Sequence, residues 1–385
     1  MIVEIRKAGF VNKGAEMMLL SIIEQIAERY PDATLVMAPT TERGSQPFSK
    51  IARLGFRSKF RLRRGKIDLS WVGMFIPAKI RNAYGIVLDT EIDIVLDASG
   101  FSYSDQWGTY DCEELKDAIK KGKKYQQKFI LLPQAFGPFD MKSNVDNIKK
   151  AVENADLVFA RDSVSLAHLT GVFDKPLANL LQKPDFTCNL KPIIDVEVKS
   201  KKGMVPIVPN YRMLDKTDET ISGAYIEALK ESVSIVIEKG LTPYFLIHET
   251  ALDKEIALKI ISSLDAKDIV IIEENDPRII KGYLGTARFV ISSRYHATVS
   301  ALSQCVPVVG TSWSHKYEEL FSEYDYIEGL CSIDQFSDLK NLITKLSLDE
   351  THSEVVKILQ KNSQKVKNDV LDMWQNVFSV IDRIE

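Results

Sequence analysis

A short stretch in the second half of the chain, SSRYHATVSALSQ, places an arginine and a histidine where an apolar strand gives way to a helix. We expect a buried strand at Phe289–Ile291, with Arg294 and His296 in the first turn of the helix that follows. A helix N-terminus already carries roughly half a positive charge and free N–H groups. Two further cations there are unfavourable unless an anion lies between them. The stretch therefore predicts an anion-binding site, and the alternative is a capped helix start with a core histidine.

Other cations follow neighbouring strands in the same way. The next strand, VPVVGTS, leads to Trp313, His315 and Lys316, which we expect on the same edge. In the first half, the strand LVFA ends at Arg161, whose guanidinium could hold a carboxylate or phosphate through two parallel hydrogen bonds. The alternative for Arg161 is an ion pair with Asp162, which would contribute little by itself.

Two glycine-containing turns in the first half could meet a polar ligand. The turn GFVNKGAE puts Asn12 and Glu16 at the start of a helix. The turn DASGFSYSD ends a buried strand in small residues, followed by Ser102 and Asp105, and small residues let a ligand approach the backbone closely. The alternatives are structural: Asn12 caps the helix, Glu16 complements its dipole, and Asp105 is a solvated turn residue.

The elements that must position these residues alternate between short apolar strands and helices in both halves of the chain. This alternation predicts an α/β fold with two Rossmann-like lobes, each a parallel sheet covered by helices. A lysine-rich stretch, KPIIDVEVKSKKG, separates the halves, so we expect lobes at 1–190 and 191–350. An amphipathic helix over 351–385 should pack back on them. Ligands of parallel sheets bind at the carboxyl ends of strands, which predicts a site in the cleft between the lobes.

Composition narrows the class of protein. The chain has 385 residues, of which 45% are hydrophobic and 27% charged, as in an ordinary globular protein. Its net charge of -3 gives no general attraction to nucleic acid. Four cysteines lack CxxC or zinc-site spacing, so we expect free thiols and no metal. The sequence has no apolar leader and no apolar run long enough to span a bilayer, which leads us to expect a cytoplasmic protein.

One stretch is strongly basic. Arg43 to Ile67 contains nine basic residues and no acidic one, interleaved with Phe48, Phe56 and Phe60. Two interpretations stay open: a solvated loop, or contact with an anionic acceptor or the inner membrane face. The stretch lacks the fold context of a nucleic-acid-binding module.

Several stretches, in order along nearly the whole chain, resemble the polysaccharide pyruvyl transferase family: GFVNKGAE, SGFSYSD, PQAFGP, ARDSVSLAHL, PDFT and SSRYHATVSAL with VPVVGTSWSHKYEEL. This family moves the enolpyruvyl part of phosphoenolpyruvate onto sugar hydroxyls, mostly as a cyclic pyruvate ketal. The resemblance implies a GT-B-like arrangement of the lobes, phosphoenolpyruvate as co-substrate without a further cofactor, and a saccharide acceptor, either free or lipid-linked. It leaves open whether the protein is a homo-oligomer.

The resemblance also implies roles for individual residues. It assigns phosphoenolpyruvate binding to four cationic or protonatable side chains: Arg161, Arg294, His296 and Lys316. His296 would donate a proton or hold the phosphate, and these roles are not separated. On the acceptor side it implies two polar contacts and a base that is one of two carboxylates: Asn12 and Ser102, with Glu16 or Asp105. The family often has Asn-x-Gly-Asp where this chain has NKGAE, which affects the identity of the acceptor.

Two other functions are compatible with a basic helix start. One is a GT-B glycosyltransferase that uses a nucleotide sugar, whose diphosphate would occupy the same turn. The other is a non-catalytic protein that binds an anion or glycan. Release of phosphate from phosphoenolpyruvate distinguishes the predicted transferase from both.

Overall fold

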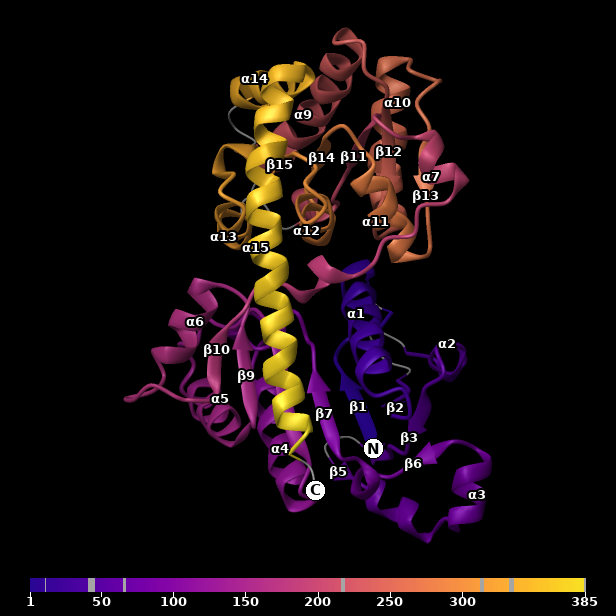
Figure 1. The fold of residues 1–385 in the computed structure, drawn as a ribbon, viewed down its shortest axis with the longest axis vertical. Helices are drawn as coiled ribbons and strands as arrows, with labels where there is room; N and C mark the ends of the chain where they lie inside the picture. The colour runs from indigo at the N-terminus through magenta and orange to yellow at the C-terminus, as the bar shows by residue number, and fades with distance from the viewer. Residues whose placement is uncertain are drawn as a thin grey trace. The chain divides into compact units, whose positions relative to one another are not determined.

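The computed structural model describes residues 1–10, 12–40, 46–64, 67–215, 219–311, 315–331 and 336–383. The chain forms two compact units, one of Met1–Phe186 with Asp369–Glu385 and the other of Thr187–Asn368. Each unit contains a parallel sheet flanked by helices (Figure 1), so the predicted α/β class is confirmed.

The first unit is built on an eight-stranded parallel sheet in the order β10-β9-β8-β7-β1-β2-β3-β6. Its strands are β1 (Ile2–Arg6), β2 (Thr34–Met37), β3 (Arg57–Lys59), β6 (Ile86–Val87), β7 (Ile94–Asp97), β8 (Lys128–Gln134), β9 (Leu157–Ala160) and β10 (Leu180–Gln182). Its helices are α1 (Lys13–Arg29), α2 (Phe48–Arg53), α3 (Ala78–Ala83), α4 (Tyr110–Lys124), α5 (Lys142–Asn154) and α6 (Ser163–Thr170). The order of the strands along the chain reverses between β1 and β7: β2 and β3 follow on one side, and β8, β9 and β10 on the other. Such a switch point is where α/β sheets usually bind ligands.

The second unit has a six-stranded parallel sheet in the order β13-β12-β11-β14-β15-β16. Its strands are β11 (Val205–Val208), β12 (Pro243–Ile247), β13 (Ile271–Glu273), β14 (Val290–Ser292), β15 (Val308–Thr311) and β16 (Leu330–Cys331). Its helices are α7 (Val196–Ser200), α8 (Arg212–Asp215), α9 (Glu219–Glu238), α10 (Ala251–Leu264), α11 (Pro277–Gly285), α12 (Tyr295–Leu302), α13 (His315–Glu323) and α14 (Phe336–Ser347). Here the order reverses between β11 and β14.

The central strands are uninterrupted apolar runs because both faces of each sheet are covered. Every residue of β7, β11, β14 and β15 is buried. Parallel strands with helices on both faces lose the alternation of polar and apolar residues that exposed sheets show. This is why the sequence signals these strands as short runs such as IVL and VVG.

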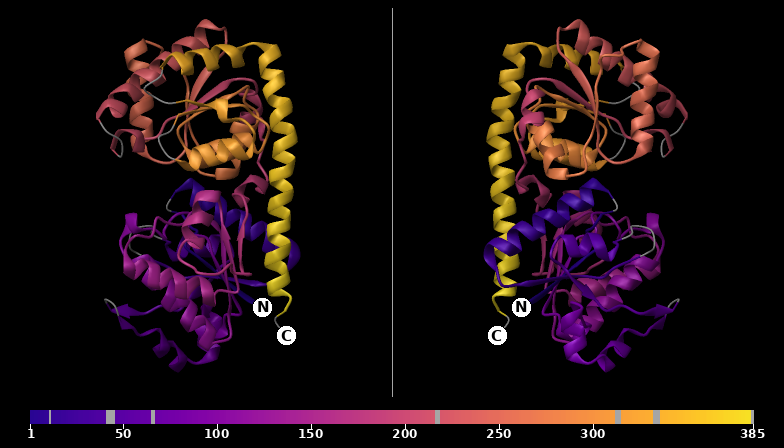
Figure 2. Two further views of the ribbon diagram at one scale, coloured as in Figure 1. Left: turned by 90° about the vertical axis from the view of Figure 1, so that its left-hand side faces the viewer. Right: turned by 90° about the vertical axis from the view of Figure 1, so that its right-hand side faces the viewer.

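The C-terminal helix α15 is a single helix from Asp349 to Ile381 (Figure 2). The apolar residues that recur along it at helical spacing are buried: Val355, Leu359, Val366, Val370, Trp374 and Phe378. In the first unit, Trp374 packs edge-on against Phe186, with ring centroids 5.9 Å apart. Among the described residues no helix combines the length and hydropathy needed to cross a membrane.

Candidate functional site

Arg294 lies at the carboxyl end of β14, immediately before helix α12. Its backbone is extended (φ -107°, ψ 122°), and it occupies the N-cap position, with the helix beginning at Tyr295. The Arg294 amide donates to the hydroxyl oxygen of Ser292 at 3.1 Å. The expectation that Arg294 lies in the first helical turn is therefore wrong, because the strand extends to Ser292, one residue further than predicted, and the helix begins after Arg294. His296 does lie in the first turn, as predicted.

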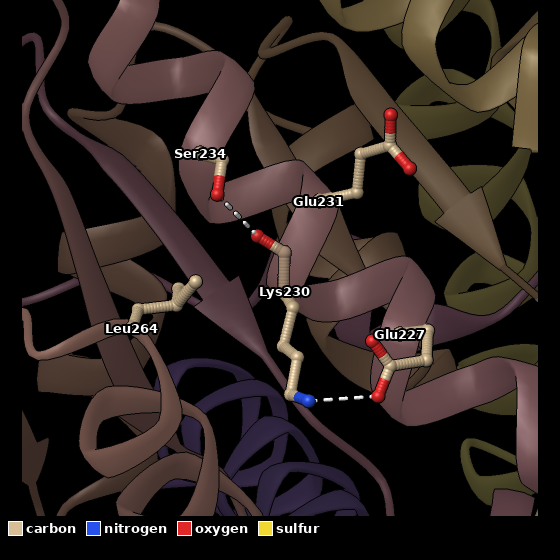
Figure 3. Close-up of a pocket in the computed structure, with 5 residues that line it drawn as sticks. All are labelled: Glu227, Lys230, Glu231, Ser234 and Leu264. Atoms are coloured by element: carbon tan, nitrogen blue, oxygen red, sulfur yellow. Dashed lines mark hydrogen bonds and ion pairs between the residues drawn. The ribbon is translucent and has the colours of Figure 1, made fainter.

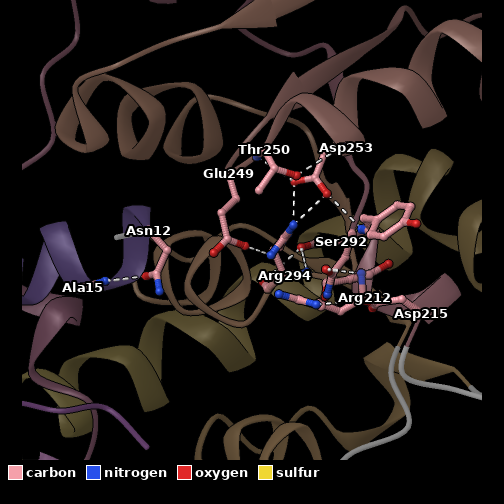
Figure 4. Close-up of polar contacts among 12 residues, drawn as sticks. Asn12, Ala15, Arg212, Asp215, Glu249, Thr250, Asp253, Ser292 and Arg294 are labelled. Atoms are coloured by element: carbon pink, nitrogen blue, oxygen red, sulfur yellow. Dashed lines mark hydrogen bonds and ion pairs between the residues drawn. The ribbon is translucent and has the colours of Figure 1, made fainter. Parts of the chain in front are cut away.

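The guanidinium of Arg294 binds two carboxylates of the same unit (Figure 4). Its Nη2 lies 2.6 Å from each carboxylate oxygen of Asp253, and its Nη1 contacts Glu249. Asp253 is completely buried, whereas the side chain of Glu249 is 22% exposed. The anion that this helix start requires is thus supplied by the protein itself, so the positive charge alone does not demonstrate a bound ligand.

Asp253 is fixed in place by the start of helix α10. It forms a capping box with Thr250, and one of its oxygens accepts a hydrogen bond from the Tyr211 amide at 2.8 Å. Burial raises the pKa of Asp253 to about 6 and lowers that of Arg294 to about 10. Both groups remain charged at pH 7, and the buried pair holds the Arg294 guanidinium in one orientation.

A second layer of hydrogen bonds joins the ends of three neighbouring strands behind Arg294. The Ser293 hydroxyl lies 2.6 Å from that of Thr311 and 2.8 Å from that of Tyr225. The Ser293 carbonyl accepts from Tyr317 and from Asn210, each at 2.8 Å. The backbone that carries Arg294 is therefore rigid, as a site that must hold a ligand in one orientation requires.

His296 and Lys316 both lie against the ring of Tyr295. The half-buried His296 ring meets Tyr295 edge-on, with centroids 5.4 Å apart. The ammonium of the exposed Lys316 lies 5.6 Å from the ring centroids of both Tyr295 and Tyr317. The structure thus brings the predicted Arg294, His296 and Lys316 together around one helix start; His315 begins α13, and Trp313 lies outside the described residues.

Arg161 belongs to the first unit and follows strand β9. It is buried, with its Nη1 3.6 Å from a carboxylate oxygen of Asp185 and its Nε 3.9 Å from Asp162. Asp162 caps helix α6 by accepting from the Ser165 amide at 2.7 Å. Asp162 is therefore the cap of this helix, and the ion pair predicted as the alternative for Arg161 extends to Asp185.

Asn12 and Glu16 lie at the start of α1, as the turn motif predicts: Asn12 is the N-cap and Glu16 is in the first turn. The Asn12 side chain accepts from the Ala15 amide at 2.8 Å (Figure 4), so it is the helix cap. The Glu16 carboxylate lies 3.2 Å from Lys13 Nζ. A Cβ on Gly9 would meet Gln46, at 2.1 Å from its side-chain nitrogen, so the glycine makes room for a protein side chain. These contacts agree with the structural alternative and leave acceptor binding by Asn12 a prediction.

Asp105 fixes the start of helix α5. It accepts hydrogen bonds from the amides of Asp140 and Met141 at 2.5 and 2.8 Å, and from the Asn144 side chain at 2.6 Å. Partial burial acts to raise the pKa of Asp105, but the bonds from Asn144 and the two amides outweigh it and lower the pKa. A carboxylate with a lowered pKa is a weak base, which favours Glu16 as the base. Ser102 lies in the same loop as Asp105 and is partly exposed.

We expect Asp105→Ala to act mainly on stability. Loss of the bonds that fix the start of α5 should lower the free energy of unfolding by about 1–2 kcal/mol, the usual cost of removing a helix cap. The phosphate release that the resemblance predicts should change by less than about threefold, because a loss of about 1 kcal/mol leaves most molecules folded. Urea unfolding and a phosphate-release assay measure the two effects, and a large loss of turnover in a folded variant would restore Asp105 as the base.

A buried charge network at the switch point of the first unit is not signalled by any motif in the sequence. Arg6, at the end of β1, lies opposite Asp97, at the end of β7, and its Nη2 is 2.6 Å from Glu114. The Tyr103 hydroxyl donates to Asp97 at 2.9 Å. Burial raises the pKa of both Asp97 and Tyr103. The only sequence signal is that charged residues end two apolar strands, which becomes informative once the strands are known to be neighbours.

A surface depression of about 460 Å³ lies on helices α9 and α10 of the second unit (Figure 3). Its lining includes Glu227 and Lys230, whose side chains pair at 2.7 Å, and Leu264. It lies on helix faces rather than at strand ends, and its one cation, Lys230, is already paired with Glu227, so we assign it no ligand. Within the described parts of the chain no group of three His, Cys, Asp or Glu side chains is arranged to hold a metal ion.

Comparison with solved structures defines the class of fold. The chain is similar to HepE of Anabaena, solved with UDP and glucose, at 14% identity and a TM-score of 0.58, covering 100% of this chain and 99% of that one. It is also similar to the UDP-GlcNAc 2-epimerase of Neisseria meningitidis, solved with UDP-GlcNAc (10%, TM-score 0.59, 98% and 99%). A third structure is Medicago truncatula UGT71G1 with UDP-glucose (10%, TM-score 0.53, 98% and 98%). The two α/β units thus make the chain a protein of the GT-B-type fold class.

Within this class, the family is defined by sequence. The model of the polysaccharide pyruvyl transferase family matches residues 12–315, and the chain belongs to that family. The matched region contains the Arg161 turn and the Arg294 helix start. No curated protein sequence matches the chain.

Proposed function

We propose that this protein transfers the pyruvyl group of phosphoenolpyruvate to sugar hydroxyls of a polysaccharide or its precursor and releases phosphate. The observation that carries the proposal is membership of the polysaccharide pyruvyl transferase family over residues 12–315. The grouping of Arg294, His296 and Lys316 at one helix start supports it, because phosphoenolpyruvate carries a carboxylate and a phosphate of about -1.5 to -2 charge at pH 7.

The reaction that we propose needs one proton donor and one proton acceptor. His296 gives a proton to the methylene carbon of phosphoenolpyruvate, which leaves a cationic centre at C2 stabilised by its oxygen. One sugar hydroxyl adds to C2, and a second then displaces inorganic phosphate to complete the ketal. The proton of the first hydroxyl passes to a carboxylate, for which Glu16 is the better candidate, and that of the second leaves with phosphate. Arg161, Arg294 and Lys316 stabilise the charge that develops on the phosphate.

Glu249 occupies the position on Arg294 that a substrate anion would take. It is the more exposed of the two carboxylates on that guanidinium, whereas Asp253 is buried and capped into α10. We propose that the phosphate or carboxylate of phosphoenolpyruvate replaces Glu249 on Nη1, while Asp253 keeps its contacts with Nη2. Asp253 is thus a positioning residue, and Glu249 competes with the substrate.

This competition predicts that Glu249→Gln lowers the KM for phosphoenolpyruvate by about twofold to fivefold. The change is small because a partly exposed ion pair contributes only a small free energy, which the substrate no longer has to replace. The kcat should stay unchanged, because Glu249 would not contact the substrate in the reacting complex. Steady-state kinetics measure both constants. Glu273→Gln, which removes an ion pair with Lys254 on the surface of the same unit, is the matched control and should leave KM unchanged. A higher KM, or loss of kcat, in Glu249→Gln would show that Glu249 assists the reaction instead.

The proposal is tested by incubating the protein with phosphoenolpyruvate and a panel of saccharide acceptors. We expect acceptor-dependent release of phosphate and a product heavier by one pyruvyl group in the mass spectrum. Turnover of a nucleotide sugar without use of phosphoenolpyruvate would instead identify a glycosyltransferase. We expect the reaction to take place in the cytoplasm, because all four cysteines are free thiols, which a reducing compartment preserves.

A further inference from the structure

The segment from Leu62 to Tyr84, which connects β3 to β6, exposes an unusual amount of apolar surface. It contains a six-residue 3-10 helix at Ser70–Phe75 and helix α3, which lies beside β6 (Figure 1). Seven of the 22 large hydrophobic side chains exposed among the described residues belong to this segment of 23 residues, far more than its share: Leu62, Ile67, Trp71, Met74, Phe75, Ile80 and Tyr84. Such a concentration marks a surface that binds a partner.

The segment is fixed to the first unit, so these side chains are held at its surface. The Leu69 amide donates to the Leu62 carbonyl at 2.8 Å, and the Leu62 amide donates to the Ser70 hydroxyl at 3.1 Å. A Cβ on Gly73 would lie 2.5 Å from the ring of Phe60 and 2.7 Å from Leu88, so this turn packs tightly inward. The opposite side presents large side chains that are more than half exposed: Trp71, Met74 and Phe75.

The charge of the segment has one sign. The sequence from 62 to 84 has five basic residues and one acidic residue, a net charge of +4 in a chain whose total is -3. The single acidic side chain, Asp68, is bound to Lys121 at 2.9 Å and accepts from the Ser70 amide. Lys79 is exposed on α3 between the apolar side chains. Arg81 is held by Glu91, so among the described side chains of the segment Lys79 is the one that places positive charge between the exposed apolar groups, within a stretch whose sequence is net basic.

The basic stretch that the sequence singles out, Arg43 to Ile67, overlaps this segment only at its end. Residues 41–45 and 65–66 lie outside the described residues. Within the described part, Lys59 is directed inward, 2.6 Å from Glu4 and 2.7 Å from Asp89. The surface with both exposed aromatic rings and positive charge is centred further along the chain.

We propose that the 62–84 surface binds the surface of an anionic lipid bilayer. Tryptophan, tyrosine and phenylalanine rings insert at the level of the lipid headgroups, and lysine and arginine attract anionic lipids, each by about 1 kcal/mol near the surface. A second copy of the chain would carry the same positive charge on this surface, which disfavours self-association. The inference goes beyond the proposed function, because lipid binding is measured without phosphoenolpyruvate or an acceptor.

The experiment uses the full chain and large vesicles of either phosphatidylcholine alone or phosphatidylcholine with about one third phosphatidylglycerol, a charge density that attracts polybasic segments. We expect co-sedimentation only with the anionic vesicles, weakening as salt rises. The double variant Trp71→Ser/Phe75→Ser should bind roughly tenfold more weakly or worse, because it loses two exposed rings that bury on contact. Trp107→Ser is the matched control, since Trp107 is 56% exposed against 55% for Trp71 but lies outside the segment.

A second measurement keeps the test independent of the folding of the double variant. Brominated anionic lipid should quench tryptophan fluorescence of the wild type, and the conservative Trp71→Phe should remove most of the quenching while the protein still binds. Absence of binding to anionic vesicles at low salt would overturn the proposal. So would equal binding by the double variant and the Trp107→Ser control, or concentration-dependent self-association that the double variant abolishes.

Discussion

Replacing Arg294 with methionine is expected to lower the free energy of unfolding by about 3–5 kcal/mol and phosphate release by at least about 100-fold. The stability loss arises because Asp253, completely buried, is left without the guanidinium that contacts both of its oxygens. The loss of turnover arises because the phosphate of phosphoenolpyruvate loses the cation that we propose to bind it. Urea unfolding and the phosphate-release assay measure the two effects.

The double variant Arg294→Met/Asp253→Leu separates these effects. Replacement of a buried ion pair by apolar side chains of similar volume is often neutral or stabilising, so we expect most of the lost stability to return. Activity should not return, because the proposed phosphate ligand is still absent. A double variant with wild-type turnover would show that Arg294 serves only to neutralise Asp253.

The single variant should also show a dependence of stability on pH that the double variant lacks. Burial raises the pKa of Asp253 to about 6, and without Arg294 that pKa should rise further. A carboxylate whose pKa is higher in the folded state binds a proton on folding, so its cost is absent at low pH and appears as pH rises through the folded-state pKa. The free energy of unfolding of Arg294→Met should therefore fall short of that of the double variant by less at about pH 5 than at about pH 8. A deficit that is equal at both pH values would mean that Asp253 takes up no proton when the variant folds, and is therefore already ionised in the folded variant at both.

The sequence predicts the strands and their fold class because each central strand is a buried run between turns, a purely local signal. The run before Arg294 is predicted within one residue, since β14 is Val290–Ser292. The grouping of Arg294, His296 and Lys316 could also be predicted, because residues that follow neighbouring parallel strands meet at one edge of a sheet.

The partners of these residues could not be predicted, because they come from elements far away in the sequence. Asp253 lies 41 residues before Arg294, in the first turn of a helix that follows a strand two positions away in the sheet. Asp105 meets its donors 35 to 39 residues later, at the start of α5. Both carboxylates look like free polar residues in the sequence, and only the packed structure shows that their charges are already in use.

The largest effect on chemistry is expected for His296→Ala, which should reduce kcat by about 100- to 10,000-fold if His296 donates the proton to phosphoenolpyruvate. The variant should remain folded, because the imidazole is only half-buried and its edge-on contact with Tyr295 is a modest packing interaction. His352→Ala is the matched control. Its ring is also half-buried in the second unit, 2.7 Å from the Arg288 carbonyl, and it should not affect kcat.

The two roles left open for His296 predict different kinetics. A proton donor acts only in the transition state, so its loss lowers kcat and kcat/KM together and leaves the KM for phosphoenolpyruvate nearly unchanged. A phosphate ligand acts in the ground state as well, so its loss raises KM, by about tenfold for a charge-assisted hydrogen bond worth about 1.5 kcal/mol. His296→Gln sharpens the distinction, because glutamine can donate a hydrogen bond to phosphate but cannot transfer a proton. Recovery of KM without recovery of kcat would assign His296 to proton donation, and wild-type kinetics in both variants would remove it from the site.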